Sequence, residues 1–229
     1  MKNIDDICFV IYARLDSHRA PNKMLRPFGD STLIDVALSK IKRCEEIPLS
    51  NFYLCVHEPE LIYRGNAHGV KVFKRSYESA HEDSKLPVLM EWWDKLPYTY
   101  CIIHSACVPF LRHQTIDKFV RAFRESDSEG MFSVVQRNTY YWNKEKQLVT
   151  PWPEGEDLMN SKSVEATYEG IGALFAGRLD TIGDGKWMGS FQKPNDPELF
   201  VIEDGKEALD IDDEWEFDLC DAYFKNTEV

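Results

Sequence analysis

Short apolar runs alternate with helical stretches along most of this chain, and that alternation limits its fold more than any other feature. ICFVIYA (7–13) is a continuous apolar run, as strands buried on both faces are. NFYLCVH (51–57) and YTYCIIHS (98–105) are predicted to be strands as well. Helical periodicity follows at 30–44 and again at 114–126. Strands that alternate with helices build a mostly parallel sheet with helices on both faces. The sequence therefore predicts a three-layer α/β/α fold.

The remaining elements continue the same pattern. Further strands are expected at 69–74, 131–137, 166–179 and 199–204, and further helices at 86–96 and 212–225. In the helix at 30–44, we expect Asp30 or Ser31 to be the N-cap. Its apolar stripe consists of Leu33, Val36, Ala37 and Ile41. In such sheets, ligands bind at the carboxyl ends of the strands.

Composition and charge restrict the class of protein. The formal net charge is −12, so sequence-independent binding to nucleic acid is not expected. No apolar run approaches the roughly 20 residues that span a bilayer, and the N-terminus lacks a signal-peptide cleavage pattern. We expect a cytoplasmic protein that binds no membrane. Six scattered cysteines form no C-x-x-C pair, so they are interpreted as structural thiols: Cys8, Cys44, Cys55, Cys101, Cys107 and Cys220.

The segment 138–163 departs from this pattern. Its large aromatic residues stand among charges, proline and glycine: Tyr140, Tyr141, Trp142 and Trp152. They could stack on a base or a sugar, but we expect them to pack against a partner subunit, because soluble monomers rarely keep such patches exposed. No repeat or second full-sized domain is visible. We therefore expect a single domain over 1–229 with an arm-like insertion at 138–163.

Positive charge gathers directly after the first apolar run. YARLDSHRAPNKMLRPFG places five basic residues within thirteen positions: Arg14, His18, Arg19, Lys23 and Arg26. Such a cluster on an acidic chain favours a small, highly charged anionic ligand over a solvated surface loop, which is the alternative. The loop has neither the G-x-x-x-x-G-K pattern nor G-x-G-x-x-G, so P-loop and dinucleotide-binding motifs are not indicated.

A second polar motif lies near the C-terminus. Asp210 and Asp212 alternate around Ile211 in LDIDD, so on a strand both carboxylates share one side while Ile211 points inward. Two carboxylates suit Mg²⁺ that bridges nucleotide phosphates. The alternative is that Asp212, Asp213 and Glu214 cap the last helix.

These motifs carry a family resemblance. ARLDSHRAPNKMLRPFGDSTLI resembles the signature loop of the cytidylyltransferases that activate acidic sugars, which make CMP-sialic acid and related CMP-nonulosonates and, more distantly, CMP-KDO. Three later segments are similar to the same family: CIIHSACVPFLRHQTIDKFVRAF (101–123), VEATYEGIGALF (164–175) and GKEALDIDDEWEFDLCDA (205–222). The resemblance implies a Rossmann-like sheet of the nucleotide-diphospho-sugar transferase type, with a small dimerisation arm.

The resemblance also implies an activity and its residues. Such enzymes transfer CMP from CTP to the sugar and release pyrophosphate, with Mg²⁺ or Mn²⁺. The implied nucleotide-binding residues are Ala13, Arg14, Ser17, Lys23, Arg75 and Ser105. Arg14 and Lys23 would hold the triphosphate, and Asp210 and Asp212 the metal. Asp212 could also accept the proton of the attacking hydroxyl. For Arg75, the alternative is an ordinary surface arginine.

Several positions depart from the family pattern. His18 stands where the family often has lysine, and Ser105 where sialic-type members often have glutamine. Ile171 and Leu174 replace an asparagine and a phenylalanine that line the sugar pocket in relatives. SACVPF lacks the aspartate of CMP-KDO synthetases, which favours the nonulosonate branch. The leading hypothesis is a CTP-dependent cytidylyltransferase that works as a homodimer. The alternatives are another sugar nucleotidyltransferase, a glycosyltransferase and a catalytically silent relative.

Overall fold

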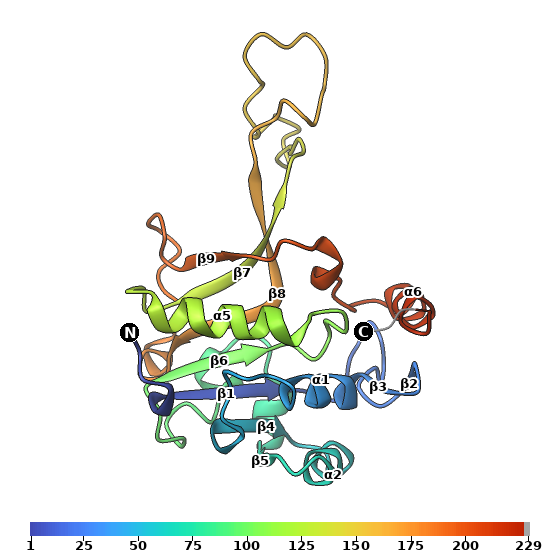
Figure 1. Cartoon of the computed structure of the whole chain (residues 1–229), viewed down its shortest axis with the longest axis vertical. Coiled ribbons are helices and arrows are strands. Elements are labelled where there is room, and N and C mark those ends of the chain that lie inside the picture. Colours follow the sequence, from blue (N-terminus) through green and yellow to red (C-terminus); the bar gives the residue numbers. More distant parts are fainter. Residues whose placement is uncertain (227–229) are drawn as a thin grey trace.

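A seven-stranded sheet forms the centre of the molecule. The computed structural model describes residues 1–226, and the strand order is β5-β4-β1-β6-β8-β7-β9 (Figure 1). The strands are β1 (Ile7–Tyr12), β4 (Phe52–Val56), β5 (Lys71–Lys74), β6 (Tyr100–His104), β7 (Met131–Arg137), β8 (Thr167–Arg178) and β9 (Glu198–Val201). Two short strands, β2 (Pro27–Phe28) and β3 (Ser31–Thr32), form a separate hairpin. The predicted strands are thus all present.

Most neighbouring strands of the sheet run parallel. β1 pairs in parallel with β4 and β6, β4 with β5, and β7 with β9. β8 runs antiparallel to both β6 and β7. β1 and β6 therefore end at the same edge in the middle of the sheet. Ligands of such folds bind at this edge.

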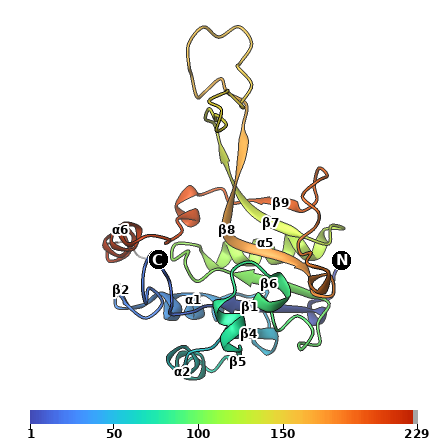
Figure 2. The ribbon, with the colours of Figure 1, turned by 180° about the vertical axis from the view of Figure 1, so that it is seen from behind.

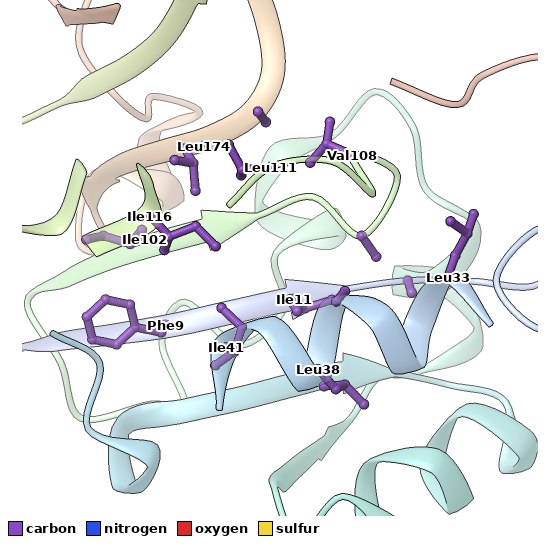
Figure 3. Close-up of a cluster of buried hydrophobic side chains, with 14 of the residues drawn as sticks. Phe9, Ile11, Leu33, Leu38, Ile41, Ile102, Val108, Leu111, Ile116 and Leu174 are labelled. Carbon is purple, nitrogen blue, oxygen red and sulfur yellow. The ribbon is translucent and has the colours of Figure 1, made fainter. Parts of the chain in front are cut away.

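Helices cover the sheet on both faces, as the sequence predicts. The helices are α1 (Leu33–Ile41), α2 (Pro59–Ala67), α3 (Tyr77–His81), α4 (Leu86–Leu89), α5 (His113–Glu125) and α6 (Glu214–Phe224). Phe9 and Ile11 of β1 face α1 and belong to one core cluster (Figure 3). The alternate residues Cys8 and Val10 face a second cluster that contains Trp92. No helix within residues 1–226 is long and apolar enough to cross a membrane.

Some helices differ from the sequence prediction. The helix expected at 86–96 ends at Leu89, and the chain then turns so that Trp92 is completely buried. The N-cap of α1 is Thr32 and neither Asp30 nor Ser31, because the short β2–β3 hairpin comes first and the Thr32 hydroxyl accepts from the Asp35 amide. α2 and α3 were not predicted.

An arm projects from the sheet (Figures 1 and 2). The ribbon of β7 and β8 carries the loop 138–166 away from the helices, so this loop lies far from the carboxyl end of β1. Tyr140 is buried inside the arm, with its ring centroid 6.4 Å from Trp142 and 5.6 Å from Trp152. The arm also keeps large apolar side chains exposed: Tyr141, Trp142, Val149, Trp152, Leu158 and Met159.

Candidate active site

A cavity of about 630 Å³ opens at the carboxyl ends of β1 and β6. Its walls come from the loop after β1, the segment after α3, the loop after β6, strand β8 and the segment before α6. All eight site residues predicted from the sequence line it: Ala13, Arg14, Ser17, Lys23, Arg75, Ser105, Asp210 and Asp212. Segments up to about 200 residues apart in the chain therefore meet at the predicted edge of the sheet.

The basic loop after β1 is held in a defined turn. The Leu15 amide donates to the Glu58 carboxylate over 2.7 Å, and the Asn22 amide donates back to the Leu15 carbonyl. Asn22 has φ 56°, a left-handed conformation that asparagine tolerates better than most residues. Arg14 reaches across the cavity to Asp83, with 2.9 Å between guanidinium and carboxylate. The loop is therefore anchored to the fold, although His18, Arg19 and Asn22 remain exposed.

Lys23 is the most enclosed cation of this loop. It is 9% exposed, and its Nζ donates to the carbonyl of Ile211. The Asp212 carboxylate lies 3.9 Å from the same ammonium group. Lys23 thus joins the basic loop to the acidic segment before α6.

The two carboxylates of that segment differ in environment. Ile211 is fully buried between them, as the sequence predicts, although the segment is not part of a strand. Asp210 Oδ1 is buried and has no hydrogen-bond partner among residues 1–226. Burial, and then the nearby charge of Asp212, raise the pKa of Asp210 to about 6. Asp212 is half-exposed and pairs with Arg19 over 2.8 Å.

Helix α6 begins immediately after these carboxylates. Its N-cap residue is Asp213, and the Glu216 carboxylate accepts from the amides of Asp212 and Asp213 at 2.7 and 2.8 Å. The start of α6 is thus capped by Asp213 and Glu216, and Asp212 is not its N-cap residue. The Asp212 carboxylate faces the cavity instead.

Arg75 and Ser105 lie deeper in the cavity wall. Arg75 is 2% exposed, so the surface alternative is wrong. Its Nε donates to the Ser79 hydroxyl over 3.0 Å and its Nη2 to the Leu89 carbonyl over 3.1 Å. Burial lowers the pKa of the Arg75 guanidinium. The side chain stays protonated at neutral pH, because the pKa of arginine starts above 12. Ser105 Oγ accepts from the Cys107 amide over 3.1 Å.

One expectation about the cavity wall is wrong. Ile171 and Leu174 do not line the cavity, because both side chains are buried in the core on the other face of β8. Their neighbours Gly172 and Phe175 line it instead. The pairing of β8 with β7 is irregular between Gly170 and Phe175, so Ile171 and Leu174 share the core face although they are three residues apart. The loss of the family's asparagine at Ile171 therefore changes core packing in this chain and not the cavity surface.

The structure adds residues that the motif did not assign. Arg19 lies in the basic cluster, but its partner Asp212 could not be inferred from spacing. Asp83 and Tyr12 also line the cavity, and nothing in the sequence marks them. The cavity thus combines the cationic side chains of Arg14, Arg19, Lys23 and Arg75 with four carboxylates, those of Glu82, Asp83, Asp210 and Asp212.

The residues present fit a divalent cation. Among residues 1–226 no group of three or more His, Cys, Asp or Glu side chains could hold a metal by itself. Mg²⁺, however, is commonly held by one or two carboxylates plus substrate phosphates. The unpartnered Asp210 Oδ1 is an oxygen that a cation would satisfy. Gly172 leaves room there, since a Cβ would lie 3.3 Å from Asp210 Oδ2.

Comparisons with known proteins agree with this geometry. A family model described as cytidylyltransferase matches residues 8–170. The spore coat polysaccharide biosynthesis protein SpsF of Bacillus subtilis (strain 168) is 23% identical over 128 residues, which are 55% of this chain and 53% of SpsF. The match thus spans about half the length of this curated relative.

Solved structures share the fold. A CMP:2-keto-3-deoxy-manno-octonic acid synthetase complexed with CTP superposes with a TM-score of 0.70 at 14% identity, covering 96% of this chain and 99% of the other. A 4-diphosphocytidyl-2C-methyl-D-erythritol synthase from Anaerococcus prevotii DSM 20548 gives 0.65 at 12% identity, covering 97% and 100%. The α/β fold expected from the sequence is therefore confirmed.

Proposed function

The chain belongs to the cytidylyltransferase family, and we propose that it transfers CMP from CTP to an acidic keto-sugar of the sialic-acid type with release of pyrophosphate. One observation carries the proposal: Arg14, Arg19, Lys23 and Arg75 converge on one cavity with the carboxylates of Asp210 and Asp212. A nucleoside triphosphate needs such a set of positive charges.

In the proposed reaction, each of the cavity residues has its own role. Arg14, Arg19 and Lys23 bind the triphosphate, and Ala13 and Ser17 lie on the same loop. A sugar hydroxyl oxygen forms a bond to the α-phosphorus, while the bond from that phosphorus to the bridging oxygen breaks and pyrophosphate leaves. Negative charge on the phosphate oxygens is stabilised by the fixed cations. The Asp212 carboxylate accepts the hydroxyl proton.

Asp210 and Asp212 would hold Mg²⁺ or Mn²⁺. When bound, the cation would neutralise charge on the phosphate oxygens. The raised pKa of Asp210 suits this role, because an unpaired buried carboxylate gains most from a cation. Lys23 keeps the acidic segment beside the phosphate-binding loop through the Ile211 carbonyl.

The sugar class rests on the resemblance and on the charge of the cavity. A keto-acid sugar carries a carboxylate of its own, which positive groups beyond those needed for the phosphates would bind. Arg75 and Ser105, at the deep end of the cavity, are the candidates to contact the nucleoside or the sugar. The fold relative solved with CTP is a synthetase of CMP:2-keto-3-deoxy-manno-octonic acid, an acidic keto-sugar, which supports this class.

We further propose a homodimer formed through the arm at 138–163, in a reducing compartment such as the cytoplasm. The arm exposes Trp142 and Leu158, 51% and 76% accessible, on a projection with no helix over it. On the cavity-side face of the sheet, Leu199 and Val201 of β9 are also exposed. A second copy could cover both surfaces. The six free cysteines are compatible with a reducing compartment.

Nucleotide binding tests the proposed function. Calorimetry with CTP, UTP, ATP and GTP in the presence of Mg²⁺ should give the tightest binding with CTP. A variant Arg14→Ala should bind CTP much more weakly, whereas Arg26→Ala should not. Arg26 lies on the same loop but pairs with Glu214 outside the cavity, so it is a matched control. Equal binding of all four nucleotides, or none, would reject the proposal.

A further inference from the structure

Lys40 is a buried cation that the proposed reaction does not use. It lies on the inner side of α1 and is 1% exposed. Its ammonium group donates to the carbonyls of Val108 and Pro109, both at 3.0 Å. Burying an ammonium group is costly unless its protons find acceptors, and here two main-chain carbonyls of a single loop provide them. Lys40 therefore fixes the main chain of this loop at Val108 and Pro109.

The loop that Lys40 holds forms part of the cavity. It follows β6, and its residues Ser105, Ala106 and Cys107 line the cavity wall. The side chain of Val108 packs in the core beside α1 (Figure 3). Carbonyls inside the loop are thus fixed by α1, whereas its polar surface faces the ligand space.

The same loop fixes the acidic segment. The Cys107 carbonyl accepts from the Ile211 amide over 2.9 Å, and the Ile211 carbonyl accepts from Lys23. A continuous set of hydrogen bonds thus runs from Lys40 through the 105–109 loop and Ile211 to Lys23. Asp210 and Asp212 flank Ile211, so their placement depends on this set.

We propose that Lys40 is a positioning residue: by fixing the loop after β6 it fixes the segment that presents Asp210 and Asp212 to the nucleotide and its metal. The predicted effect of Lys40 on nucleotide binding rests on the proposed function. The hydrogen bonds from Lys40 through the 105–109 loop and Ile211 to Lys23, called the relay below, do not depend on it. Lys40 does not line the candidate active-site cavity, and it acts on that cavity only through the two carbonyls.

The groups around Lys40 indicate whether its charge or its N–H donors hold the loop. The charged and titratable groups around it are Arg43 and Cys44 from the end of α1, Glu207 from the 3-10 helix η4 (Gly205–Ala208), and His104 from β6. Burial, and next Arg43, lower the pKa of Lys40 to about 7. A neutral amine still donates hydrogen bonds, so the relay depends on the N–H donors and survives loss of the charge.

Two variants and one control test the relay. Lys40→Met keeps the length of the side chain but removes every donor, and Lys40→Gln keeps an amide donor. Lys42→Met is the matched control, since Lys42 is exposed at the end of the same helix. Amide hydrogen exchange of each folded variant measures the relay at 105–111 and at Ile211. Calorimetry with CTP and Mg²⁺ measures its consequence.

In Lys40→Met we expect faster exchange confined to 105–111 and Ile211, and CTP·Mg²⁺ binding weakened about tenfold, the lower end of what supporting residues of metal sites contribute. Lys40→Gln should lie between this variant and the wild type, and Lys42→Met should match the wild type. Unchanged CTP affinity in both Lys40 variants overturns the proposal, as does faster exchange spread evenly over the whole sheet. If the wild type binds no CTP but the local exchange changes, the proposed function fails and the relay stands.

Discussion

Arg14 and Lys23 share a loop and a charge, but different contacts hold them in place. Arg14 keeps 27% of its side chain exposed and pairs with Asp83 on the other side of the cavity. Lys23 is nearly buried, and its ammonium group connects two segments of the core. Truncation of Lys23 should therefore disturb the fold more than truncation of Arg14. Arg14 offers the cleaner test of phosphate binding.

Arg14→Ala should lower kcat by about a hundredfold, the scale of losing one charge contact in a transition state. The melting temperature should change little, because an exposed ion pair contributes little to stability. Steady-state kinetics and a thermal melt measure the two effects. Arg26→Ala is the control and should keep kcat. Loss of activity that merely follows unfolding would contradict a role for Arg14 at the phosphates.

Lys40 should make stability depend on pH in a characteristic way. Its pKa is about 7 in the folded protein but about 10.5 when the chain is unfolded. The unfolded state therefore binds more protons between these values, so stability rises with pH from about 7 to about 10, by at most about 1.4 kcal/mol per unit. Lys40→Met should lose this part of the slope. Denaturant unfolding of both proteins at pH 7.5 and 9 measures the difference, and parallel curves would contradict it.

Many of the residues that line the cavity can be predicted from the sequence. The basic loop around Arg14 and Lys23 and the pair Asp210 and Asp212 could be proposed from sequence, because both lie in segments that resemble signature motifs of the family. Their partners could not. Asp83 and Arg19 pair with residues 69 and 193 positions away, and such distant contacts leave no local pattern.

At the scale of elements, strands were easier to predict than helices. β1, β4 and β6 are central strands whose continuous apolar runs mark them within two residues. α2 was missed because only Leu61 and Gly65 are buried among its nine residues. α3 has five residues and too few turns to show periodicity. The helix predicted at 86–96 failed because packing of Trp92 overrides local propensity.

Strand β8 should be sensitive to a single methyl group. Gly172→Ala would place a Cβ in the cavity, 3.3 Å from Asp210 Oδ2, so we expect weaker binding of CTP·Mg²⁺ with little loss of stability. Gly205→Ala is the control, because no atom lies within 4 Å of its added Cβ. Calorimetry and thermal melts of both variants provide the readout. Undiminished CTP·Mg²⁺ binding by Gly172→Ala would place the ligand away from Asp210.

At the scale of the whole molecule, the arm is the feature that we expect to contact a second subunit. Trp142 and Trp152 each pack on the buried Tyr140, so the arm has a small aromatic core of its own. Its outer residues remain exposed, which soluble monomers rarely sustain without a partner. The composition of 138–163 indicated the arm, but the direction in which it projects could not be predicted without the sheet.

The protein should therefore be a homodimer at micromolar concentration. Sedimentation should give a species of twice the chain mass, and Trp142→Ala or Leu158→Asp should shift it toward the monomer. Leu158 is the better probe, since it is 76% exposed and has no part in the small aromatic core of the arm. A 26.6 kDa species across that range would refute the dimer. Variants that stay dimeric would place the interface elsewhere.

Pyrophosphate release tests the central claim most directly. The wild type is assayed with each of CTP, UTP, ATP and GTP against a panel of acidic keto-sugars, with Mg²⁺ and with a chelator. We expect release with CTP, dependent on one of the sugars and abolished by the chelator, and about a hundredfold less with Arg14→Ala. Full turnover with the chelator present, or a preference for UTP or ATP, would contradict the account.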